Sequence, residues 1–70
     1  MPNTYTAVTK QDGSWWIGWI EEVPGVNCQE KTRTKLLESL TITLREALEF
    51  NKREAVRAAE PEYSEELVTV

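Results

Sequence analysis

The sequence has 70 residues, a formal net charge of −4, one cysteine and no histidine. This length allows a single domain, residues 1–70, with a core of marginal size. With Cys28 as its only cysteine, the chain forms no intrachain disulfide, and without histidine it forms no Cys/His metal site.

The sequence also lacks the residue patterns of common active sites. No histidine is present to activate a serine or cysteine, and no Gly-rich phosphate loop is found. Glu21 and Glu22 are neighbours in a predicted strand, so their carboxylates point to opposite faces and do not share a site. We therefore expect no catalytic residues, no metal and no cofactor, and the chain is not expected to be an enzyme.

Charge and hydropathy narrow the class of partner. The last ten residues contain three glutamates and no basic residue, whereas the basic residues of the predicted helix alternate with glutamates. Because nucleic-acid binding needs a continuous basic surface, this balance counts against RNA and favours a basic protein. No signal sequence and no apolar run of membrane-spanning length is present, so a cytoplasmic protein is expected, with no DNA-binding domain within these residues.

A β-hairpin is predicted at the start of the chain. Residues 4–10 are rich in β-branched and aromatic side chains, and residues 15–22 contain all three tryptophans. Gln11-Asp12-Gly13-Ser14 separates them, and Asp-Gly between two such runs is a strong turn signal. The two strands are therefore expected to be antiparallel neighbours.

The second strand is apolar on both faces. Alternation places Trp16, Gly18 and Ile20 on one face and the side chains of Trp15, Ile17 and Trp19 on the other. A glycine inside a strand is tolerated where another element comes close, so we expect the helix over Gly18. A bulge at this glycine is the alternative, and it would shift the faces by one residue.

A short strand and a long helix follow Pro24-Gly25. Residues 26–29 are long enough for a third strand, and Thr32 is expected to cap a helix over residues 33–59 that Pro61 ends. A helical stripe is predicted with Leu36 beside it; its members are Leu37, Leu40, Leu44, Ala47, Leu48, Asn51 and Ala55. Residues 67–70 are predicted to form a last strand that pairs with a sheet edge or with another subunit.

These elements predict an α+β fold of β-β-β-α-β order, with one long helix over one face of a small antiparallel sheet. One helix covers only one face, so the apolar surface of the second face is expected to bind another protein. We predict a homo-oligomer, most simply a dimer, since small domains without disulfides or metals often gain stability by association. The predicted interface residues are Trp15, Ile17, Trp19, Glu21 and Glu22.

The pattern resembles the N-terminal domain of the HicB-type antitoxins and their short relatives, over residues 4–50. Trp16-Ile17-Gly18-Trp19-Ile20 matches the family's aromatic-rich strand, Glu22-Val23-Pro24-Gly25 matches its Pro-Gly element, and Thr32 falls on its helix-cap position. The sequence departs from the family at Glu21, Glu30 and Lys35, where the pattern has proline, glycine and glutamate, and its helix is longer than usual.

This resemblance implies a fold like a double-stranded-RNA-binding domain or a reduced ribonuclease H fold. It also implies an antitoxin that binds a small basic HicA-type ribonuclease toxin and masks it. Two other interpretations stay open on the residues alone: an RNA-binding module of that fold, and a self-associating domain without a toxin.

Overall fold

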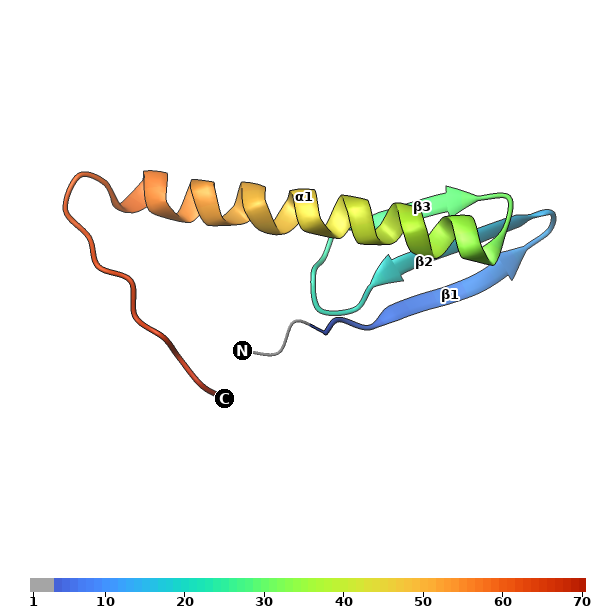
Figure 1. Ribbon diagram of the computed structural model, residues 1–70, viewed down its shortest axis with the longest axis horizontal. Coiled ribbons are helices and arrows are strands. Elements are labelled where there is room, and N and C mark those ends of the chain that lie inside the picture. The colour runs from blue at the N-terminus through green and yellow to red at the C-terminus, as the bar shows by residue number, and fades with distance from the viewer. Residues whose placement is uncertain (1–3) are drawn as a thin grey trace.

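The computed structural model describes residues 4–70, and the predictions that extend to residues 1–3 lie outside this part. The chain forms three strands and one helix: β1 (Ala7–Asp12), β2 (Trp15–Ile20), β3 (Asn27–Glu30) and α1 (Arg33–Ala59). The strands make one antiparallel sheet in the order β1-β2-β3, and α1 lies across one of its faces (Figure 1). The predicted α+β class is confirmed.

The hairpin turn is tighter than predicted. Asp12 pairs with Trp15, so only Gly13 and Ser14 form the loop, and β1 extends two residues beyond the predicted end. Gly13 has φ of +63°, as the first loop residue of a type II′ turn requires. Between positions 4 and 70 only glycines have a positive φ, so the turn has its glycine at the position that requires one.

The helix-facing side of β2 is as predicted. Ile20 is buried, Trp16 packs against the core, and the position of Gly18 lies under α1. A Cβ atom added at Gly18 would lie 2.9 Å from the carbonyl oxygen of Val8 and 3.0 Å from Cδ2 of Leu36. Gly18 is therefore present because the helix side chains occupy the space above it.

The core is small and sits between the first half of α1 and the sheet. Its buried residues are Ile20, Val26, Leu36 and Leu40, and the half-buried Leu44 and Ala47 extend it along the helix. Leu36, which was predicted to lie beside the apolar stripe, is the most buried residue of the core. α1 lies mainly over β2 and β3 and contacts β1 least. The side of the helix that carries Leu36 therefore faces the sheet more directly than the predicted stripe implied.

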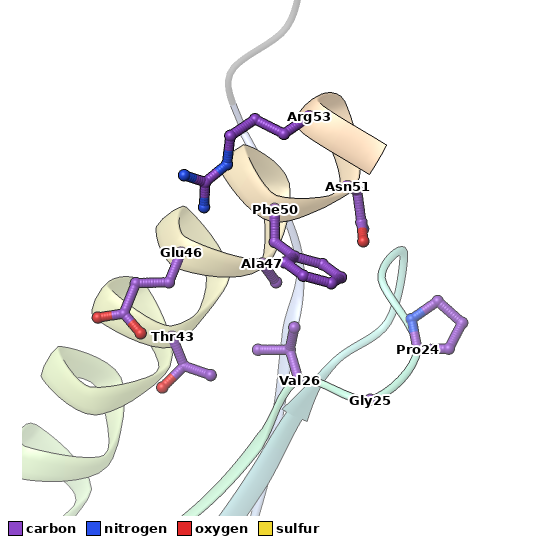
Figure 2. Close-up of a pocket in the computed structure, with 9 residues that line it drawn as sticks. All are labelled: Pro24, Gly25, Val26, Thr43, Glu46, Ala47, Phe50, Asn51 and Arg53. Carbon is purple, nitrogen blue, oxygen red and sulfur yellow. The ribbon is translucent and has the colours of Figure 1, made fainter. Parts of the chain in front are cut away.

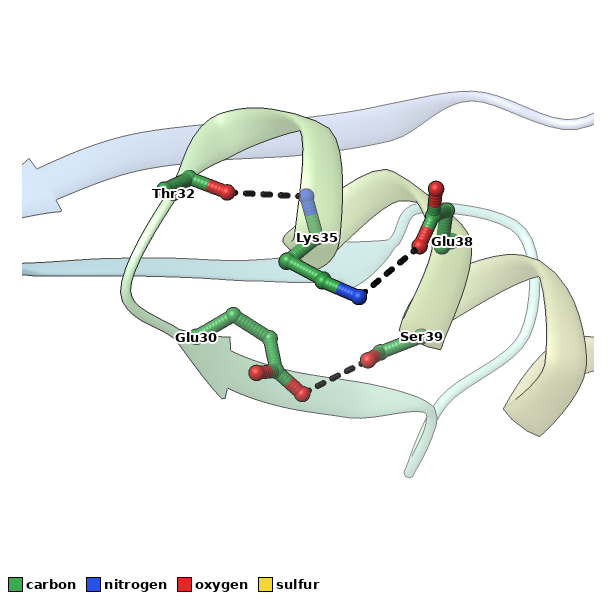
Figure 3. Close-up of polar contacts among 5 residues, drawn as sticks. All are labelled: Glu30, Thr32, Lys35, Glu38 and Ser39. Atoms are coloured by element: carbon green, nitrogen blue, oxygen red, sulfur yellow. Dashed lines mark hydrogen bonds and ion pairs between the residues drawn. The ribbon is translucent and has the colours of Figure 1, made fainter.

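Polar contacts fix the start of the helix (Figure 3). The hydroxyl of Thr32 accepts a hydrogen bond from the backbone N–H of Lys35 at 3.1 Å, so the predicted N-cap is confirmed. Lys35, which stands where a capping box would have glutamate, pairs instead with Glu38 at 3.8 Å. The hydroxyl of Ser39 donates to Glu30 at 2.7 Å, which ties the first turns of α1 to the end of β3.

The C-terminal segment differs from the prediction. Residues 67–70 form no strand, and the side chains of Leu67 and Val68 are 92% and 78% exposed. Figure 1 shows α1 extending well past the sheet, and the C-terminal segment then turns back below the overhanging end of the helix. An alternating apolar sequence becomes a strand only when a sheet edge pairs with it, and the overhanging helix holds this segment away from its own sheet.

Candidate interaction face

The face of the sheet opposite α1, called here the open face, gathers side chains from all three strands. Residues directly opposite each other in an antiparallel pair share a face, so the strand register defines its members. The open face consists of Val8, Lys10, Asp12, Trp15, Ile17, Trp19, Asn27 and Gln29. It is an apolar row along β2 with a polar row on β3 and a mixed row on β1.

The three apolar residues that the sequence predicts for this face do lie on it together. Trp15 and Trp19 are 37% and 40% exposed, and Ile17 is half-buried between them. Indole side chains bury about 150–250 Å² each when covered. Two such side chains on a strand of six residues leave an unusually apolar surface for so small a domain.

Lys31, to which no sequence pattern pointed, lies beside the same site. Its ammonium lies 4.0 Å from the centre of the ring of Trp15, a residue that the strand register places on the open face. A cation over an indole is attracted by the negative face of the ring, and at an exposed site this is worth about 0.5–1 kcal/mol. The contact holds the Trp15 ring in place, and it adds a positive charge to the rim of the open face.

β2 ends at Ile20, so the predicted interface residues Glu21 and Glu22 lie in the turn after the strand and not in the strand as predicted. Glu21 is exposed just beyond Trp19, and its backbone N–H donates to the carbonyl oxygen of Thr6 at 2.9 Å. The carboxylate of Glu22 accepts from the backbone N–H of Thr6 at 2.8 Å and from the hydroxyl of Thr6 at 2.7 Å. Glu22 therefore fastens the segment before β1 to the end of β2.

The contact of Glu22 with Thr6 makes stability depend on pH. Both Thr6 hydrogen bonds favour the carboxylate, the backbone one most, so they hold the pKa of Glu22 below its ordinary value. The unfolded chain then binds a proton more readily than the folded one. The stabilisation is present above the ordinary pKa of a glutamate and is lost as the pH falls through the lower pKa of the folded state.

We expect Glu22→Gln to lower the urea midpoint of unfolding at pH 7. Near pH 2 the variant and the wild-type chain should have the same midpoint, because the side chain at position 22 is neutral in both. Urea unfolding followed by tryptophan fluorescence at both pH values measures this difference. Glu21→Gln is the matched control, and its midpoint should change less at pH 7. Equal effects of the two substitutions at pH 7 would contradict this role of Glu22.

A hollow on the helix side of the sheet lies apart from the predicted interface (Figure 2). It has a volume of about 570 Å³ and lies between the Pro24–Val26 turn and α1. The ring of Phe50 faces Val26 across it and is 54% exposed. Phe50 falls off the predicted helical stripe, so periodicity gave no signal for it.

Within residues 4–70, no three Cys, Asp or Glu side chains are grouped so that they could hold a metal ion. The thiol of Cys28 is half-buried and lies 3.5 Å from the hydroxyl of Thr43, between β3 and α1. The same part of the chain contains no helix long and apolar enough to cross a membrane.

Comparisons with protein-family models, with curated proteins and with solved structures found no match for this chain. The function of this chain is therefore inferred from its fold and from the open face.

Proposed function

We propose that this chain is a non-catalytic protein-binding domain, a HicB-like antitoxin of the cytoplasm that binds a small basic HicA-type ribonuclease and masks it. The observation that carries the proposal is the exposed pair Trp15 and Trp19 on the side of the sheet that α1 does not cover. The resemblance of residues 4–50 to the HicB pattern supplies the class of partner.

The open face has the composition of a protein-binding surface. Interface cores are enriched in tryptophan and depleted in charge, and a polar rim surrounds them. Here Trp15, Ile17 and Trp19 form the apolar centre, while Asn27 and Gln29 of β3 provide hydrogen-bonding groups at its side. The strand that carries the indoles is paired on both sides, so little backbone order has to be gained on binding.

The charge of the whole chain supports a basic partner. The net charge is −4, and the segment after α1 contributes Glu60, Glu62, Glu65 and Glu66. Such a field attracts a cationic protein surface and speeds its association. A ribonuclease exposes a cationic surface to RNA, so an acidic domain that covers this surface would compete directly with the substrate.

We expect Trp15→Ala and Trp19→Ala each to weaken binding of the proposed HicA-type ribonuclease partner by about 2 kcal/mol, or roughly 30-fold. The far-UV circular dichroism should stay that of the wild-type chain, because both side chains lie outside the core. Calorimetric titration and inhibition of RNA cleavage measure the effect. Ile42→Ala, which removes an exposed helix side chain, is the control.

Unchanged affinity in both tryptophan variants would contradict the assignment of the open face. Failure of the wild-type chain to inhibit the ribonuclease at all would contradict the antitoxin function itself.

An RNA-binding module is the second candidate, because two lysines adjoin the tryptophans. Lys10 lies opposite Ile17 on the open face, and Lys31 covers the Trp15 ring. Aromatic side chains on a sheet with nearby cations are a common platform for single-stranded RNA. This candidate predicts that Lys10→Ala and Lys31→Ala weaken RNA binding and reduce its dependence on salt.

A further inference from the structure

A second apolar surface lies on the helix side of the sheet, along the β1 edge, where α1 makes the fewest contacts. Two adjoining hollows of about 370 and 180 Å³ share Tyr5, Thr41 and Leu44, so they form one continuous groove between β1 and α1. Ala7 and Leu40 lie at its inner end, and the outer end carries a basic side chain, Arg45. This surface is called here the β1 groove.

The β1 groove borders a free sheet edge. β1 pairs only with β2, so its other side presents unpaired backbone N–H and C=O groups. Such an edge accepts a further strand, and a strand that paired there would place alternate side chains in the groove. The site therefore needs a short extended segment with an apolar residue at every second position.

Residues 67–70 have this pattern and no partner of their own in the structure. Val68 and Val70 fall on one side of an extended backbone, Leu67 and Thr69 on the other, and all three apolar side chains are largely exposed. Glu65 and Glu66 come immediately before them. Valines in the groove would leave Leu67 and Thr69 on the open-face side of the added strand, with Thr69 beside Val8.

We propose that the β1 groove binds residues 67–70 of a second copy of this chain, which pair with the free edge of β1 as a fourth strand. The charges orient the pairing: Glu65 and Glu66 meet Arg45 at the outer end of the groove. In the structure, the ion pairs of α1 within residues 4–70 join Lys35 with Glu38 and Arg57 with Glu54, and Arg45 takes part in neither.

The length of α1 favours a second copy over the chain's own segment. Ala47 is the last helix residue that packs against the core, and α1 continues for twelve residues to Ala59, about 18 Å at 1.5 Å per residue. This overhang carries residues 67–70 away from their own sheet and exposes Phe50. A second copy would cover both the overhang and the groove, and it would enlarge a core of only four buried residues.

A disulfide trap tests the pairing. In a Cys28→Ser background, Val8→Cys combined with Thr69→Cys places both thiols on the open-face side of neighbouring strands. We expect mild oxidation to give a covalent dimer on a non-reducing gel. The control combines Gln29→Cys, at the far edge of the sheet, with Thr69→Cys, and it should give much less dimer. A disulfide within one chain would assign the groove to the chain's own segment and contradict the exchange; no disulfide would contradict the docking.

Sedimentation equilibrium gives an independent test. Val68→Asp combined with Val70→Asp should raise the dimer dissociation constant by about tenfold or more, because it puts charges into the apolar groove. Tyr63→Asp combined with Ser64→Asp adds the same two negative charges outside the strand and is expected to leave a dimer. A wild-type chain that is monomeric at micromolar concentration, or a valine variant that dimerises as tightly as the wild type, would overturn the proposal.

Discussion

Leu36→Ala is expected to lower the free energy of unfolding by about 2–5 kcal/mol, the range for removing a buried leucine side chain. Leu36 has no exposed surface and lies at the centre of a core with four buried residues. A domain of this size has only a few kcal/mol of stability, so most of the chain should be unfolded at 25 °C. Urea unfolding followed by far-UV circular dichroism measures the loss.

Ile42→Ala is the matched control for Leu36→Ala. Ile42 is on the same helix but is 56% exposed, and alanine favours the helix more than a β-branched residue does. Its stability should stay within about 0.5 kcal/mol of the wild-type chain. If Leu36→Ala were equally harmless, α1 would not pack on the sheet through Leu36.

Gly18→Val should destabilise the fold by about 1–3 kcal/mol or more, although valine is the better strand former. Its Cβ would lie 2.9 Å from the backbone carbonyl oxygen of Val8, and the two methyl groups would have to displace Leu36 and Leu40. A backbone atom of the paired strand does not move without loss of the β1–β2 hydrogen bonds. Thermal unfolding of both chains measures the effect.

Gln29→Val provides the comparison for Gly18→Val, because it puts the same side chain at an exposed position of β3 on the open face. That variant should be as stable as the wild-type chain or slightly more stable. A neutral or stabilising Gly18→Val would show that α1 does not lie close above β2, and the open face would have to be assigned again.

Local signals predicted most of the fold. Thr32 and Pro61 defined the helix ends, because a cap and a helix-breaking residue act within a few positions of their own place in the chain. Alternation in residues 15–20 predicted which side of β2 each tryptophan occupies, and Gly18 predicted which of these sides the helix covers. Each of these inferences needs only neighbouring residues and standard strand or helix geometry.

Contacts between distant residues were not predictable in the same way. The pairing of Glu22 with Thr6 depends on the β1–β2 register, and the position of Lys31 over Trp15 depends on how the chain leaves β3. The rotation of α1 toward Leu36 depends on where the helix rests on the sheet. The strand predicted at residues 67–70 failed in the single chain because alternation does not say whether a sheet edge is within reach.

The most direct test of the open face is photo-crosslinking in cells, with a photoreactive phenylalanine analogue in place of Trp19. We expect adducts with one small basic protein, which persist after ribonuclease treatment and are absent when the analogue replaces Ile42 on α1. Adducts that disappear on ribonuclease treatment would assign the open face to RNA. Equal adducts from positions 19 and 42 would contradict the claim that the tryptophan side of the sheet is the binding surface.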